Sequence, residues 1–332
     1  MDKTGARRRA IIVLGMHRSG TSALAGTLAR LGARLPARQI VATTHNAKGH
    51  FEPYRIVAIH NRLLASAGLH WADWQVLPRT WLTSPAASAF VRELAAAVRE
   101  DYGNAPLFVV KDPRMCLLVP LWRRVLEDVG AEARFAIALR HPAEVAWSLQ
   151  ARDQIPTQQA YLTWLRHLIE AERSTRESKR LFVHFDELLA NPVTIASDIA
   201  ALLTDGTLAL DRDRERSIVA FIDKGLRHHV VGSVRPEPQV ASCPWVLEAY
   251  EALGRLVHDP TDGVAIGELD RISAAFDHAT GLLASLTAEQ KTHISSLMHQ
   301  LETIKSSTSW RLLAPLRWYG RKRSGRNRAS FR

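Results

Sequence analysis

Residues 10–22 read Ala-Ile-Ile-Val-Leu-Gly-Met-His-Arg-Ser-Gly-Thr-Ser. The apolar, β-branched start of this stretch is typical of a strand that is buried on both faces. Gly15 and Gly20 follow, and Thr21 opens a helical pattern that ends at Gly32. A strand, a turn and a helix N-terminus in this order present backbone N–H groups and the positive end of the helix dipole to an anion. The stretch therefore predicts a phosphate-binding loop.

The side chains of this loop add further groups that bind phosphate. Arg18 carries a guanidinium that can fork onto phosphate oxygens. Hydroxyl groups are present at Ser19, Thr21 and Ser22. The spacing from Gly15 to Gly20 matches the loop of nucleoside-triphosphate enzymes, but Thr21 occupies the position where such enzymes need lysine. We therefore expect phosphate binding without triphosphate hydrolysis. The plainer alternative is a turn in which the glycines have no ligand.

Three more apolar runs outside the loop predict buried strands. These runs cover residues 107–110, 135–139 and 181–185. Helical patterns separate the strands, over residues 53–67, 85–100, 117–129, 142–151, 157–178, 192–204 and 213–222. Strands that alternate with helices predict an α/β fold with a central parallel sheet covered on both faces.

A second polar motif follows the strand predicted over residues 135–139. Arg140 leaves this strand at its carboxyl end, where α/β folds bind ligands. Pro142 suits the first turn of a helix, and Ser148 lies about two turns further along it. A guanidinium and a hydroxyl in this arrangement could hold one phosphate.

Together, the two motifs resemble those of sulfotransferases that use 3′-phosphoadenylyl sulfate (PAPS). The loop is similar to the family's 5′-phosphosulfate loop, in the bacterial and Golgi-type branch where arginine precedes Ser-Gly-Thr. Residues 139–148 resemble the 3′-phosphate motif. The resemblance covers residues 10–230 and implies a three-layer P-loop NTPase-like fold, PAPS as co-substrate and no metal. It implies donor contacts from His17, Arg18, Ser19, Gly20, Thr21, Ser22, Arg140 and Ser148.

Sulfuryl transfer to a hydroxyl also needs a base and groups that stabilise the transferring charge. The Golgi-type branch uses a glutamate in a place comparable to Glu52, so the resemblance implies Glu52 as general base, with His50 as second candidate. The alternative is that Glu52 only caps the following helix. Lys111 and Arg114, at the end of the second strand, are candidates for contacts with the sulfuryl group or with an anionic acceptor. The sequence has no HExxH or clustered Cys/His motif, which agrees with the absence of a metal.

Other candidate contacts come from aromatic and late basic residues. Trp71 and Trp74 could form an aromatic wall for the acceptor, although buried core tryptophans are an equal alternative. Lys224 and Arg227 are candidates for a loop that closes over the donor.

The composition restricts the class of protein. Two cysteines in 332 residues predict no disulfide framework and a cytoplasmic location. No apolar run reaches the roughly 18 residues of a membrane span. The formal net charge is +11, and much of the excess lies in the last 22 residues. The tail over residues 306–332 mixes arginine with aromatic side chains and resembles tails of bacterial cell-envelope polysaccharide enzymes. It predicts peripheral contact with the inner membrane face, or a solvated terminus, and no specific nucleic acid.

We therefore predict a sulfotransferase domain over residues 1–235, a helical region over 236–305 and the basic aromatic tail. The helical region carries apolar residues at three- and four-residue steps from Leu269 to Ile304. It is either a coiled coil, which would allow a dimer, or helices packed on the core. The acceptor is predicted to be a hydroxyl of a glycan or a lipid-linked saccharide. The alternatives are a nucleotide or small-molecule kinase and a non-catalytic membrane-docking module.

Overall fold

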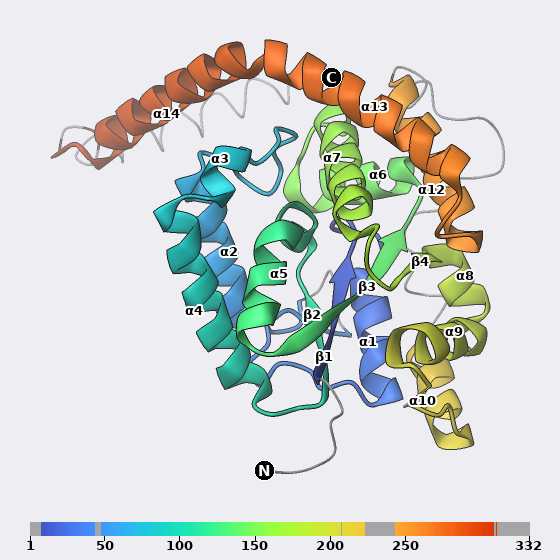
Figure 1. Cartoon of the computed structure of the whole chain (residues 1–332). Coiled ribbons are helices and arrows are strands. Elements are labelled where there is room, and N and C mark those ends of the chain that lie inside the picture. Colours follow the sequence, from blue (N-terminus) through green and yellow to red (C-terminus); the bar gives the residue numbers. More distant parts are fainter. Residues whose placement is uncertain (1–7, 44–47, 207, 223–242, 309, 311–332) are drawn as a thin grey trace, which may run out of the picture. The chain divides into compact units, whose positions relative to one another are not determined.

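A sheet of four parallel strands forms the centre of the molecule (Figure 1), with the strand order β2-β1-β3-β4. The computed structural model describes residues 8–43, 48–206, 208–222, 243–308 and 310. The strands are β1 (Arg8–Leu14), β2 (Leu107–Lys111), β3 (Ala131–Leu139) and β4 (Arg180–His184). All four predicted strands are confirmed, and β4 ends at His184 because a helix begins at Phe185.

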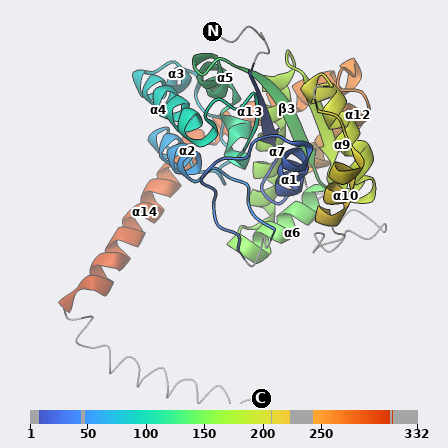
Figure 2. The ribbon, with the colours of Figure 1, turned by 90° about the horizontal axis from the view of Figure 1, so that it is seen from below.

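Helices cover both faces of this sheet, and they form two separate apolar cores with it (Figure 2). One core includes α1 (Thr21–Leu31), α8 (Phe185–Ala190), α9 (Pro192–Thr204) and α10 (Arg212–Phe221). The other includes α2 (Tyr54–Ser66), α4 (Pro85–Tyr102), the 3₁₀ helix η1 (Pro113–Leu117), α5 (Val119–Asp128), α6 (Pro142–Asp153), α7 (Thr157–Thr175), α12 (Pro244–His258) and α13 (Gly263–Leu282). The short α3 (Arg79–Leu82) packs on α4. The predicted three-layer α/β architecture is therefore confirmed.

The alternation of side chains along β1 explains the two cores. Ile12 and Leu14 pack on one face of the sheet, and Ile11 and Val13 pack on the other, and all four are fully buried. Successive side chains of a strand point to opposite faces, so an unbroken apolar run covers both sides at once.

The parallel arrangement brings the carboxyl ends of the strands to one edge. In the register of the sheet, Val13 of β1 pairs with Lys111 of β2, and Leu14 pairs with Ile137 of β3. The segments that follow β1, β2 and β3 therefore leave the sheet close to one another, where open α/β sheets bind ligands.

The contacts divide the chain into two compact units, Met1–Asp277 and His278–Arg332. The apolar faces of α12 and α13 complete a core of the first unit. Leu269, Ile272 and Phe276 are almost completely buried in that core, as the packed-helix alternative predicts.

The second unit contains α14 (Ala284–Ser306), and it is described separately. Leu297 and Ile304 of this helix are exposed. Residues 311–332, which include nearly all of the basic tail, lie outside the described residues. None of the described helices is long and apolar enough to cross a membrane.

Candidate active site

The loop between β1 and α1 has the backbone conformation of an anion cradle. Gly15 and Gly20 adopt φ angles of 129° and 86°, a region that disfavours residues with a Cβ. A Cβ at Gly15 would lie 2.7 Å from the carbonyl oxygen of Ala138, and one at Gly20 would collide with the ring of Phe185. Both glycines are therefore required for the close approach of the loop to its neighbours.

The N-terminus of α1 begins at this loop. Gly20 is its N-cap residue, and no side chain caps the helix within the described part of the chain. The first backbone N–H groups of α1 are therefore available to a ligand. Ser19 Oγ is buried and has no hydrogen-bond partner among the described residues. A bound anion would accept a hydrogen bond from this hydroxyl.

The second predicted phosphate motif lies directly beside the loop. The Nε atom of Arg18 donates a hydrogen bond of 2.7 Å to Ser148 Oγ on α6. Arg140, after the end of β3, donates through Nη1 to the carbonyl oxygen of Arg18 at 3.0 Å and through Nε to Glu144 at 2.8 Å. The structure therefore brings Arg18, Arg140 and Ser148 together.

A cluster of positive charge surrounds this contact. The pKa of Arg18 falls to about 10, first because the side chain is largely buried and then because Arg152 and Arg140 repel its charge. Arg152 was missed in the sequence analysis. It lies four residues after Ser148 on α6, so it shares a helix face with it, and this spacing was the signal that could have found it. Such a cluster favours an anionic ligand.

Lys111 and Glu52 form a buried ion pair beside Ser22, the residue after Thr21 at the start of α1. Lys111 Nζ lies 2.5 Å from Glu52 Oε1 and 3.3 Å from Ser22 Oγ. Ser22 Oγ also donates to the carbonyl oxygen of His50 at 3.3 Å. The pKa of His50 is lowered by burial and by Lys111, although Glu52 opposes this change. The three predicted catalytic residues, Glu52, His50 and Lys111, therefore lie around the start of α1. His50 contacts Ser22 through its backbone carbonyl, and its Nε2 lies 3.1 Å from Thr43 Oγ1.

Asp112, the residue after β2, organises a buried network. Trp122 Nε1 can only donate, and it lies 2.9 Å from Nε2 of His60, so Nδ1 of His60 donates to Asp112 Oδ2 at 2.7 Å. Asp112 Oδ1 accepts from the backbone and from Nη1 of Arg114. Burial alone would raise the pKa of Asp112, but the charge of Arg114 and the bond from His60 hold it below its usual value. No spacing in the sequence identified His60 as part of this site.

His17 of the loop contacts Trp71, with ring centroids 4.4 Å apart. Burial and the nearby charges of Arg114 and Arg152 lower the pKa of His17 well below its usual value. Trp71 thus lies against the phosphate loop. Trp74 is partly buried against the core, and its carbonyl oxygen accepts a hydrogen bond from Arg166 at 2.8 Å.

Two further predictions concern metal ions and the late basic loop. In the described ranges, no group of three or more His, Cys, Asp or Glu side chains is arranged to hold a metal ion. Lys224 and Arg227 lie outside the described residues.

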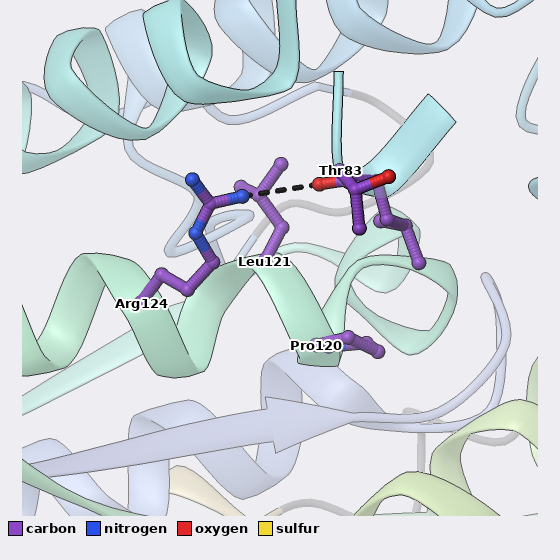
Figure 3. A pocket seen from close by; sticks show the side chains of 5 residues that line it. Thr83, Pro120, Leu121 and Arg124 are labelled. Carbon is purple, nitrogen blue, oxygen red and sulfur yellow. Dashed lines mark hydrogen bonds between the residues drawn. The ribbon is translucent and has the colours of Figure 1, made fainter. Parts of the chain in front are cut away.

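A small surface pocket lies apart from these residues, between α3 and α5. It has a volume of about 420 Å³ and is lined by Leu82, Thr83, Pro120, Leu121 and Arg124. In Figure 3, Arg124 reaches across it and donates a hydrogen bond of 3.0 Å to the backbone carbonyl oxygen of Leu82. None of the predicted site residues lines this pocket.

The chain was compared with known proteins. No protein-family model matches the sequence, and no curated protein matches it. Among solved structures, it is similar to the sulfotransferase domain of the olefin synthase of Synechococcus PCC 7002, with 16% identity and a TM-score of 0.38 over 72% of this chain and 95% of that domain. It is also similar to the sulfotransferase domain of the curacin biosynthetic pathway, with 12% identity and a TM-score of 0.41 over 71% of this chain and 96% of that domain.

Proposed function

We propose that the chain is a PAPS-dependent sulfotransferase that transfers a sulfuryl group to a hydroxyl acceptor. The hydrogen bond from Arg18 to Ser148 is the observation that carries this proposal. It joins the two predicted anion-binding motifs, at residues that are 130 positions apart in the sequence. PAPS has a 5′-phosphosulfate and a separate 3′-phosphate, so it needs two neighbouring anion sites, whereas a nucleoside triphosphate has no 3′-phosphate.

The residues of the site fit such a donor. The loop from Gly15 to Gly20, the open N-terminus of α1 and the buried hydroxyl of Ser19 would hold the 5′-phosphosulfate. Arg18, Arg140 and Ser148 would hold the 3′-phosphate. The donor supplies an activated sulfuryl group, whose bond to the 5′-phosphate breaks as the acceptor oxygen bonds to sulfur.

Glu52 and Lys111 are the residues that we assign to catalysis. Glu52 would accept the proton of the acceptor hydroxyl, and Lys111 Nζ lies 2.5 Å from its Oε1. The ammonium group of Lys111, beside Ser22, would stabilise negative charge on the donor. His50 is the second candidate for the base, because its lowered pKa leaves the imidazole unprotonated at neutral pH.

One observation favours the kinase alternative. The contact of Lys111 with Ser22 places an ammonium group beside the loop that lacks its own lysine. A kinase would bind ATP with Mg²⁺ in preference to adenosine 3′,5′-bisphosphate, the product of the PAPS reaction. The non-catalytic alternative predicts that neither ATP nor PAPS is turned over.

The acceptor, the membrane contact and the location stay proposals. The resemblance of the tail suggests a glycan or a lipid-linked saccharide as acceptor and a cytoplasmic protein that contacts the inner membrane face. Deletion of residues 306–332 should then release the chain from anionic vesicles and leave nucleotide binding unchanged. Equal vesicle binding by the full and shortened chains would refute the role of the tail. A measurement of the mass of the protein in solution tests the predicted dimer.

Calorimetric titration tests the donor. Adenosine 3′,5′-bisphosphate should give saturable binding without metal, and ATP with Mg²⁺ should bind much more weakly. Absence of binding at millimolar bisphosphate would refute the proposal, and the reverse preference would favour a kinase.

A matched pair of variants tests the base. Glu52→Gln should reduce sulfuryl transfer from labelled PAPS about a hundredfold or more and change bisphosphate affinity little. Glu127 is exposed on α5, so Glu127→Gln is the control that should keep full activity. A normal rate for Glu52→Gln would assign the base to another residue.

A further inference from the structure

Arg114 has a fixed orientation at the edge of the candidate active site. Its Nη1 donates to Asp112 at 2.8 Å, and its Nε donates to Asn61 Oδ1 at 2.8 Å. Asp112 is itself held by the hydrogen bond from His60. Two of the three guanidinium nitrogens are thus anchored, and the plane of the group is determined.

The third nitrogen of Arg114 has no partner in the described part of the chain. Every hydrogen bond of this guanidinium uses Nη1 or Nε. The side chain is about nine-tenths buried, so its charge is poorly screened by water. A buried, oriented guanidinium with an unused edge is a binding site for a carboxylate or a similar oxyanion.

Two histidines beside Arg114 have unused ring nitrogens. Nε2 of His17 and Nε2 of His167 are buried and have no hydrogen-bond partner among the described residues. Nδ1 of His167 donates to the carbonyl oxygen of Thr163 at 2.9 Å, and burial lowers the pKa of the ring to about 4. Its Nε2 therefore carries a lone pair that can accept a hydrogen bond from a hydroxyl.

Hydrogen bonds and helix packing bring these groups near one another. Thr163 Oγ1 donates to the carbonyl oxygen of Ala72, the residue after Trp71, at 2.8 Å, and the carbonyl oxygen of Thr163 accepts from His167. The 3₁₀ helix η1, which carries Arg114, packs on α7, which carries His167. Arg114 is the charge that most strongly lowers the pKa of His17, and it also lowers the pKa of His167. Arg152 adds to the effect of Arg114 on the pKa of His17, and Asp112 opposes it.

We infer that Arg114, His17, His167 and Trp71 form the acceptor subsite, and that the acceptor is an acidic saccharide with a carboxylate near its reactive hydroxyl. The carboxylate would bind the unused edge of Arg114. A ring hydroxyl would donate to Nε2 of His167, and the ring of Trp71, which packs on His17, would contact the apolar face of the sugar. The assignment of this subsite to the acceptor rests on the proposed function, but the binding of the saccharide does not depend on PAPS.

The test compares two ligands that differ in one group. Methyl β-glucopyranosiduronate carries a carboxylate where methyl β-glucopyranoside carries a hydroxymethyl group. We expect the uronide to bind the full chain about tenfold more tightly, because it adds a charge-assisted hydrogen bond in a poorly screened site. Ligand-detected NMR and tryptophan fluorescence measure both affinities. Equal affinities, or no binding of either ligand at high millimolar concentration, would overturn the inference.

Variants identify the group that recognises the carboxylate. Arg114→Lys keeps the charge beside Asp112 but loses the planar fork, and it should reduce the preference for the uronide severalfold. Asn61 is exposed, so Asn61→Ala should fold normally and still weaken the preference, because it releases Nε of Arg114. Asn104→Ala, at another exposed asparagine, is the control. An unchanged preference in both test variants would exclude Arg114 as the carboxylate site.

Titration with adenosine 3′,5′-bisphosphate separates this inference from the proposed function. Binding of the bisphosphate together with equal affinity for both saccharides would keep the sulfotransferase proposal and overturn the acidic acceptor. Preference for the uronide without binding of the bisphosphate would keep the saccharide subsite and refute the donor.

Discussion

Lys111 Nζ lies 2.5 Å from Glu52 Oε1, and only 3% and 9% of the two side chains are exposed. Lys111 is the last residue of β2, and Glu52 lies two residues before α2. The pair therefore connects the sheet with the segment that precedes α2. Because both charges are buried, the attraction between the two groups must offset the cost of removing each of them from water.

We predict that Lys111→Met lowers the free energy of unfolding by about 3–5 kcal/mol, because it leaves the buried carboxylate of Glu52 without its partner. The double variant Lys111→Met/Glu52→Gln should recover most of this loss. Urea denaturation at neutral pH measures both. Arg62 and Glu93 form an exposed pair, so Arg62→Met is the control and should cost less than about 1 kcal/mol. A double variant as unstable as Lys111→Met would show that charge pairing is not the cause.

Arg18 and Ser148 should act together in binding adenosine 3′,5′-bisphosphate. Arg18→Ala and Ser148→Ala should each weaken binding about tenfold or more, because each removes a phosphate contact and the orientation of the other side chain. The double variant should lose less than the product of the two effects, which calorimetry can measure.

The matched control for this cycle is a similar contact on the surface. Arg124 donates to Ser88 Oγ at 2.9 Å, and this contact is exposed. Arg124→Ala and Ser88→Ala should leave bisphosphate binding unchanged. Fully multiplicative effects of Arg18→Ala and Ser148→Ala would mean that their hydrogen bond does not contribute to the site.

Local patterns in the sequence were enough to predict the strands and most of the helices. The apolar run of β1 and the glycines after it predict both a buried strand and a turn. The start of α6 also follows from a local signal, since Pro142 begins this helix as expected. The phosphate loop and Arg140 could be placed at one edge because parallel strands share that edge.

The partners within the site depend on packing that local patterns do not encode. The contact of Lys111 with Glu52 depends on the register of β2 beside β1 and on the path of the chain before α2. His167 lies on a long amphipathic helix, where its position predicts a core residue. The packing of α12 depends on tertiary structure in the same way, because the sequence does not say which surface the apolar face of this helix covers.

The two buried histidines should make stability depend on pH in the acidic range. The pKa of His17 and that of His167 are lowered in the folded state, so the unfolded chain binds protons that the folded chain does not. Stability is therefore complete above the ordinary histidine pKa of 6.5 and decreases as the pH falls toward about 4. Each histidine should contribute a slope of about 1.4 kcal/mol per pH unit in this window.

Urea denaturation between pH 7 and pH 5 measures this slope. His167→Gln should reduce the slope by about 1.4 kcal/mol per pH unit, because one of the titrating histidines is then absent. His258, the last residue of α12, is exposed. His258→Gln should leave the slope unchanged. The same slope in wild type and His167→Gln would show that His167 is protonated equally in the folded and unfolded chains.

Gly20 should be essential for both stability and donor binding, and Gly68 is its matched control. Both residues have positive φ, 86° and 71°, so alanine at either position introduces backbone strain of about 1–2 kcal/mol. At Gly68 no atom lies within 4 Å of the added Cβ, but at Gly20 the Cβ collides with the ring of Phe185. Arg140 lies over that ring, 4.8 Å from its centroid. Relief of the collision must therefore move either the phosphate loop or the ring that supports Arg140.

We expect Gly20→Ala to weaken binding of adenosine 3′,5′-bisphosphate about tenfold or more and to cost about 1–3 kcal/mol beyond the loss in Gly68→Ala. Gly68→Ala should bind the bisphosphate like the wild type. Equal affinities for the two variants in calorimetry would mean that the loop accommodates the methyl group without disturbing the anion site.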